Sequence, residues 1–196
     1  QVIHTPAKRT FEGEASLSCG GRQVDLIEVG PAHTAGDLMV YVPDAAVLFS
    51  ADILFIGSTP VMWAGPVENW LAALDRIMAM DVTTIVPGHG PLTDKDGVRA
   101  VRQYWTYVSE RLYACYLQGA NEVAAAENVV LAPEYARQPF AEWNSPERIM
   151  TNAYTLYRQW KGRTDQPKGL ELLKIMRRQA LLAHRLPKAQ PHVMRR

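Results

Sequence analysis

The chain has 196 residues, of which 47% are hydrophobic and 21% are charged, and it contains only two cysteines. This composition supplies enough apolar residues for a folded core, and it excludes both a wholly disordered chain and a framework held by disulfides. No uninterrupted apolar run is as long as a membrane-spanning helix, which needs about 20 residues. We therefore expect no membrane contact, and the cytoplasm is the expected compartment.

The net charge of +1 conceals an acidic body and a basic tail. Residues 161–196 carry ten Lys or Arg and two Asp or Glu, and the remaining 160 residues carry a net charge of −7. Such a tail is typical of a solvated helix or of a segment that docks on an acidic surface. Because apolar residues also recur over 170–182, we favour a solvated helix or docking on the chain's own body, and we expect no nucleic-acid partner.

The first part of the chain carries strand patterns. Residues 24–29 have the alternation and β-branching of a strand. Residues 38–42 and 46–49 flank Pro43-Asp44, a favourable turn pair, so the sequence predicts a β-hairpin there. Together these segments predict a sheet at the start of the fold.

A helix and a further strand follow the hairpin. Residues 67–80 place Trp70, Leu74 and Ile77 on one helical face, and residues 82–86 have the pattern of a short buried strand. The Pro-Gly pair that comes directly after residue 86 is expected to end this strand.

The remainder of the chain predicts helices. Thr93 is the expected N-cap of a long helix. Its apolar stripe consists of Val98, Val101, Trp105, Val108, Leu112 and Cys115. Ser145-Pro146 opens another helix, which Gly162 ends. We therefore predict an α/β domain over residues 1–118 and a helical extension over 119–196.

Three residues with metal-binding side chains lie in loops that follow predicted strands. His33 lies in a loop bounded by glycines, Asp52 comes after the second hairpin strand, and His89 comes after the strand over 82–86. Loops on a rigid sheet can direct side chains at one point, and two imidazoles with one carboxylate suit Zn²⁺. From the residues alone, a metal site and ordinary turn residues remain equally open interpretations.

The motifs around these residues resemble the second half of a metallo-β-lactamase-superfamily hydrolase. Gly-Pro-Ala-His33-Thr-Ala-Gly-Asp37, Leu-Phe-Ser-Ala-Asp52 and Val-Pro-Gly-His89-Gly are similar to three successive motifs of that family, in order and at fitting distances. The similar segment, residues 11–98, is a little under half of the chain. The glyoxalase-II-like branch, in which the middle ligand is an aspartate, is the closest in pattern. The resemblance implies the C-terminal half of an αββα sandwich.

The resemblance also implies roles for individual residues. His33 would bind the first of two zinc ions, the catalytic Asp52 would bridge them, and His89 would bind the second, with Mn or Fe as other possible metals. Hydroxide bound to these metals would attack an ester, thioester, amide or related bond of a small-molecule substrate. Asp37 would orient an imidazole or serve as a turn carboxylate. Trp63 would contact substrate or anchor its loop.

One motif of the family is absent from this sequence. The family's His-x-His-x-Asp-His should lie upstream of His33, where the only histidine is His4. We therefore expect a partial metal complement or none in this chain alone, as in a truncated protein. We also expect either a homodimer or pairing with a missing N-terminal half. The alternative function is a non-catalytic remnant or interaction module that keeps the half-fold without a working metal site.

Overall fold

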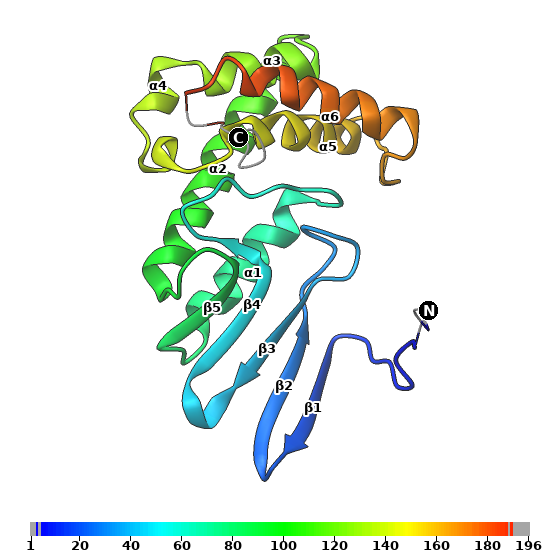
Figure 1. Ribbon diagram of the computed structural model, residues 1–196, viewed down its shortest axis with the longest axis vertical. Helices are drawn as coiled ribbons and strands as arrows, with labels where there is room; N and C mark the ends of the chain where they lie inside the picture. Colours follow the sequence, from blue (N-terminus) through cyan, green and yellow to red (C-terminus); the bar gives the residue numbers. More distant parts are fainter. Residues whose placement is uncertain (1–2, 4, 188, 190–196) are drawn as a thin grey trace.

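The computed structural model describes residue 3, residues 5–187 and residue 189, and it contains a sheet followed by helices (Figure 1). The strands are β1 (Glu14–Cys19), β2 (Arg22–Glu28), β3 (Leu38–Val42), β4 (Val47–Phe55) and β5 (Thr84–His89). The α-helices are α1 (Val67–Ala79), α2 (Lys95–Leu117), α3 (Glu122–Val130), α4 (Pro133–Ala136), α5 (Ile149–Trp160) and α6 (Leu170–Ala183). Three 3-10 turns are η1 (Pro43–Ala45), η2 (Pro139–Glu142) and η3 (Pro146–Arg148). The predicted α/β class with a helical C-terminal part is confirmed.

The five strands form one sheet in the order β1-β2-β3-β4-β5. The pairs from β1 to β4 are antiparallel, whereas β4 and β5 are parallel and are joined through α1. As a result β2, β4 and β5 all run in the same direction. Their carboxyl ends, and the loop that follows β2, therefore meet at one edge of the sheet.

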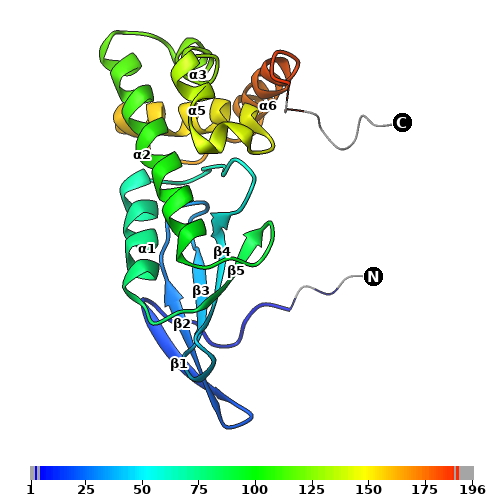
Figure 2. The ribbon, with the colours of Figure 1, turned by 90° about the vertical axis from the view of Figure 1, so that its left-hand side faces the viewer.

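One face of the sheet packs against α1 and α2 (Figure 2). Met39, Leu48 and Ile85 on this face are fully buried, and so are Trp70 of α1 and Trp105 of α2. The two indole rings lie 4.6 Å apart between their centroids. The predicted stripe on α2 is buried as expected, except that Cys115 is half-buried. This layer forms the core that holds the strand ends in place.

The opposite face of the sheet is apolar but much less covered. Leu26, Val40, Phe49 and Val86 lie directly across from one another on four neighbouring strands, so their side chains share this face. Phe49 is 45% exposed, and Leu17 on β1 is 47% exposed. An apolar sheet face of this kind normally marks an interface.

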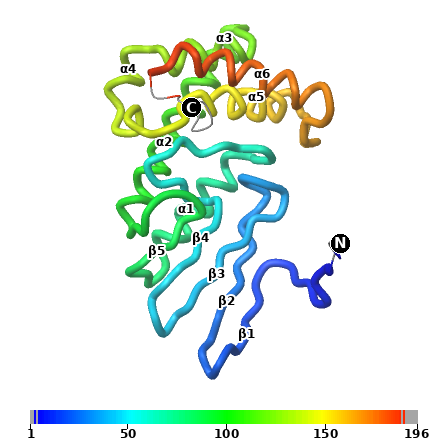
Figure 3. The backbone as a smooth tube through the Cα atoms, in the orientation of Figure 1, coloured from blue at the N-terminus to red at the C-terminus, as the bar shows by residue number. Residues whose placement is uncertain are grey.

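Helices α3 to α6 gather beyond the edge of the sheet at which β4 and β5 end (Figure 1). The tube in Figure 3 shows the segment after β4 passing next to α5 before the chain enters α1. Among the residues that the structure describes, no helix combines the length and the hydrophobicity needed to cross a membrane. The predicted boundary between residues 118 and 119 stays a prediction.

Several predicted element limits were wrong. β1 was not predicted, because it is polar and exposed on nearly every residue. The N-cap of α2 is Asp94, whose carboxylate accepts the Asp96 N–H at 2.7 Å, since Thr93 instead pairs with Ile85. β4 and β5 both extend beyond their predicted ends. The last residues of the basic tail, 188 and 190–196, lie outside the described residues.

Candidate metal centre

The structure brings the three predicted metal ligands together at the sheet edge. Nε2 of His33 lies 3.4 Å from Oδ2 of Asp52, and Nε2 of His89 lies 3.3 Å from Oδ1 of the same carboxylate. His33 comes from the loop after β2, as predicted. Asp52 lies inside β4, and His89 is the last residue of β5. The prediction that both residues follow their strands was therefore wrong.

The backbone around Asp52 departs from a regular strand. The pairing of β4 with β5 is irregular between Phe49 and Phe55, and Ala51 has a φ of 46°, in the left-handed region that non-glycine residues rarely occupy. Strain of this kind is common at functional sites. Gly88 lies against this segment, and a Cβ there would overlap Oδ1 of Asp52. The Asp52 carboxylate therefore requires glycine at position 88.

The loop that carries His33 is held by Asp37, which is buried. Its carboxylate accepts the backbone N–H groups of Ala32 and Thr34 at 3.0 Å, and the Thr34 hydroxyl donates to it at 2.7 Å. The direct contact that orients the His33 ring comes instead from the carbonyl of Val61, 2.6 Å from Nδ1. Asp37 thus acts on His33 through the loop backbone, as a turn carboxylate.

The contact with Val61 determines the tautomer of His33. A carbonyl oxygen can only accept, so Nδ1 carries the hydrogen and donates it. In the neutral ring, Nε2 then presents its lone pair to Asp52. This arrangement is typical of a histidine that binds a metal. No motif in the sequence identifies Val61, because its contribution is a backbone atom.

Aromatic rings support both imidazoles. The ring of Phe55 stacks on His89, with centroids 4.4 Å apart and planes 17° apart, and Trp70 meets His33 edge-on at 6.1 Å. The Trp70 indole N–H donates to the carbonyl of Ile53 at 2.9 Å, which ties α1 to β4. The side chain of His33 is 11% exposed and that of His89 is 50% exposed. The site therefore opens to solvent on the side of His89.

Asp52 stands between the two imidazoles and offers a different oxygen to each. Within the described part of the chain, no group of three or more His, Cys, Asp or Glu side chains is arranged to hold a metal ion. This absence agrees with the position of Asp52, because His33, Asp52 and His89 form a row and do not surround one point. A row of this kind supplies only part of a coordination shell.

Trp63 is half-buried against the core, and its backbone N–H donates to the carbonyl of His33 at 2.9 Å. Its contact with substrate stays a prediction.

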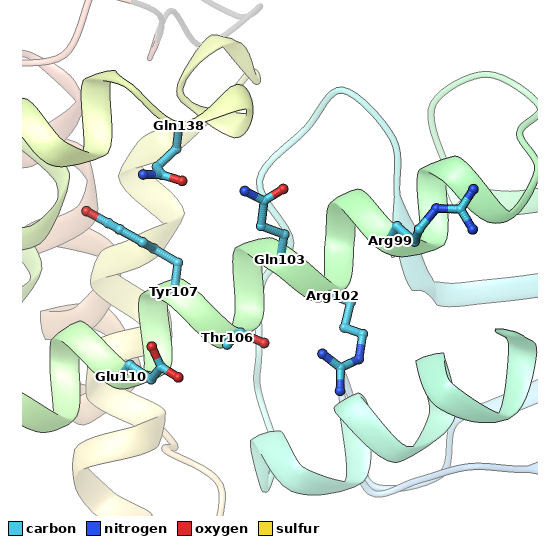
Figure 4. A pocket seen from close by; sticks show the side chains of 7 residues that line it. All are labelled: Arg99, Arg102, Gln103, Thr106, Tyr107, Glu110 and Gln138. Carbon is cyan, nitrogen blue, oxygen red and sulfur yellow. The ribbon is translucent and has the colours of Figure 1, made fainter.

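A separate hollow of about 480 Å³ lies along the exposed side of α2 and contains none of the predicted site residues. It is lined by Arg99, Arg102, Gln103, Thr106, Tyr107, Glu110 and Gln138 (Figure 4).

The sequence of the chain is similar to those of known proteins. The family model of the "Metallo-beta-lactamase superfamily" matches residues 3–89. The probable metallo-hydrolase YqgX of Bacillus subtilis is 31% identical over 99 residues, covering 48% of this chain and 46% of the relative. The hydroxyacylglutathione hydrolase of Rhizobium meliloti is 37% identical over 70 residues, covering 35% of this chain and 27% of the relative.

A further similarity extends into the helical part. The linear primary-alkylsulfatase of Pseudomonas sp. is 26% identical over 139 residues, covering 65% of this chain and 26% of the relative. A metallo-beta-lactamase family protein of Thermus thermophilus has a similar fold, with a TM-score of 0.57 at 19% identity, covering 82% of this chain and 52% of that one. The chain thus spans between about a quarter and a half of the length of these curated relatives.

Proposed function

We propose that the chain, which matches the model of the metallo-β-lactamase superfamily over residues 3–89, is the site-bearing part of a metal-dependent hydrolase of that superfamily. The bond cleaved is an ester, thioester, amide or related bond of a small molecule. The observation that carries this proposal is the Asp52 carboxylate, which offers one oxygen to each of two imidazoles at 3.3–3.4 Å.

These distances fit side chains that would bind zinc. Two atoms bound to one tetrahedral Zn²⁺ at about 2.0–2.2 Å lie about 3.3–3.6 Å apart. The His33–Asp52 and His89–Asp52 separations fall in this interval. A neutral imidazole lone pair facing a carboxylate is also an arrangement that a cation between the two groups stabilises. His33, Asp52 and His89 are therefore the residues that would hold such ions.

Cations held there would supply Lewis acidity and lower the pKa of a coordinated water. The chain's own residues prepare the site for them. Val61 keeps the proton of His33 on Nδ1, so that Nε2 is free for a ligand, and Asp37 holds the loop in that position. The stacked Phe55 restricts the ring of His89. Asp52 provides negative charge to both positions.

The remaining ligands come, in this proposal, from residues outside the present sequence or from another chain. Two observations support this: no His-x-His-x-Asp-His motif occurs in the sequence, and the curated relatives are two to four times longer than the matched part. Pairing with a missing N-terminal half and a homodimer remain the two candidate sources.

A sulfate ester is a second candidate substrate. The match to the alkylsulfatase covers 65% of this chain, and so includes residues of the helical part. The match to the hydroxyacylglutathione hydrolase covers 35%. Parallel assays with an aryl sulfate, an aryl ester and a hydroxyacylglutathione distinguish the two classes. Hydrolysis of the aryl sulfate alone would favour the sulfatase candidate.

Replacing Asp52 with asparagine is expected to weaken zinc binding strongly, because the substitution removes the negative charge that faces both imidazoles and replaces one carboxylate oxygen with an amide nitrogen. The measurement is equilibrium dialysis against Zn²⁺, followed by elemental analysis. We expect an affinity loss larger than the roughly 10–100-fold that loss of an outer partner causes. Asp81→Asn, at an exposed position, is the matched control. If wild-type protein binds zinc no better than Asp52→Asn, Asp52 is not a zinc ligand in this chain.

A further inference from the structure

One face of α5 carries a row of polar side chains directed at the segment after β4. Arg148, directly before α5, and Asn152, Thr155 and Gln159 within it are spaced by four, three and four residues, so they share one side of the helix. Each of them hydrogen-bonds to the backbone of residues 58–64. We call these four residues the α5 row.

The bonds from the α5 row bracket Val61. Arg148 donates to the carbonyl of Thr59 at 2.9 Å, and Gln159 donates to the carbonyl of Ala64. Thr155 donates to the carbonyl of Met62 at 2.7 Å. Backbone groups on both sides of Val61 are therefore fixed by a helix about 90 residues away in the sequence.

Asn152 is the most constrained member of the row. Its Oδ1 accepts the N–H of Met62 at 2.8 Å, and its Nδ2 donates to the carbonyl of Pro60 at 3.0 Å and to the hydroxyl of Tyr104 at 2.9 Å. Burial raises the pKa of Tyr104 well above its usual range, so this hydroxyl stays neutral. Asn152 is completely buried, and any of these groups left unpaired would lose its hydrogen bond without gaining water. These hydrogen bonds therefore hold the backbone of residues 60–62 in one position.

The same segment contacts His33 on two sides. The carbonyl of Val61 accepts from Nδ1 of the ring at 2.6 Å, while the carbonyl of His33 accepts the N–H of Trp63 at 2.9 Å. The N–H of Gly65 also donates to the carbonyl of Ala32 at 2.7 Å. The ring and the backbone of His33 are thus both joined to a segment that α5 holds.

We infer that the α5 row is the positioning element of His33: it places the Val61 carbonyl so that the imidazole keeps Nδ1–H and directs Nε2 at Asp52. This inference rests on the proposed function in treating His33 as a metal ligand. It assigns the helical extension a role in the metal centre. In this role Thr155 and Asn152 are positioning residues that do not themselves contact the metal or the substrate.

The test compares two buried threonines on α5 that receive the same substitution. Thr155→Val removes the bond to Met62, whereas Thr151→Val removes the bond from Thr151 to Gln179 of α6, at 2.6 Å. Nitrogen-15 NMR of the metal-free full chain reports the tautomer of His33, and a zinc titration reports affinity. We expect Thr155→Val to mix the two tautomers and to weaken zinc binding about tenfold. Thr151→Val should leave both quantities unchanged, and Thr155→Ser should restore them.

Equal effects of the two valine substitutions, or an unchanged His33 signal in Thr155→Val, would overturn the inference. The thermal midpoint of each variant shows whether the two proteins are equally destabilised. The tautomer is measured without metal, so it does not depend on zinc binding. If wild-type protein fails to bind zinc while Thr155→Val still changes the tautomer, the assignment of His33 as a zinc ligand of this chain fails and the positioning role stands.

Discussion

Replacing Gly88 with alanine is expected to remove zinc binding as fully as removal of the Asp52 charge. A Cβ at position 88 would overlap Oδ1 of Asp52 and would lie 2.7 Å from the backbone carbonyl carbon and oxygen of Ala51. The backbone of Ala51 cannot yield easily, because it already has an unfavourable φ. The carboxylate must therefore move away from both imidazoles. Overpacking of this kind also costs about 1–3 kcal/mol of folding stability.

The matched control is Gly36→Ala, in the loop that carries His33. A Cβ at Gly36 has no atom within 4 Å, and the backbone there is not left-handed, so this substitution should leave zinc affinity unchanged. Zinc titration and a denaturant curve of both variants separate loss of the site from loss of the fold. Retention of wild-type affinity by Gly88→Ala would show that the carboxylate position is not essential.

The sequence predicts that strands lie around the site, but it does not predict their lengths. Pro87-Gly88 was expected to end the last strand, because proline cannot donate to a ladder. β5 continues through both residues since it lies at the sheet edge, where Pro87 pairs with Ala51 in an irregular register. Local propensity alone cannot reveal that a strand lies at the edge of its sheet.

The convergence of His33, Asp52 and His89 could be expected from strand ends that share an edge of the sheet. The groups that orient these three side chains could not be predicted from the sequence. Val61 acts through its carbonyl, which every residue possesses. The bond between Met62 and Asn152 joins positions 90 residues apart. The sequence signal for the α5 row was a set of polar residues at helical spacing, and it was obscured by the apolar stripe of the same helix.

The second large expected effect is association of the chain through the uncovered face of its sheet. Leu17 pairs with Val24, and the row from Leu26 through Val40 and Phe49 to Val86 continues the same apolar face. Burying such a face stabilises an assembly by roughly 25 cal/mol per Å² of apolar surface. In a solution of the purified chain, the available partner is a second copy.

We therefore expect the purified chain to associate as a two-fold dimer through this face. Light scattering over a concentration series should show a mass near twice the 21.9 kDa of the chain. Phe49→Lys should shift the protein to the monomer, because it places a charge at the centre of the apolar row. Leu117→Lys, which changes a 68% exposed leucine at the end of α2, should not. A monodisperse monomer at high concentration would contradict this prediction, since the sheet face would then be stable in water without a partner.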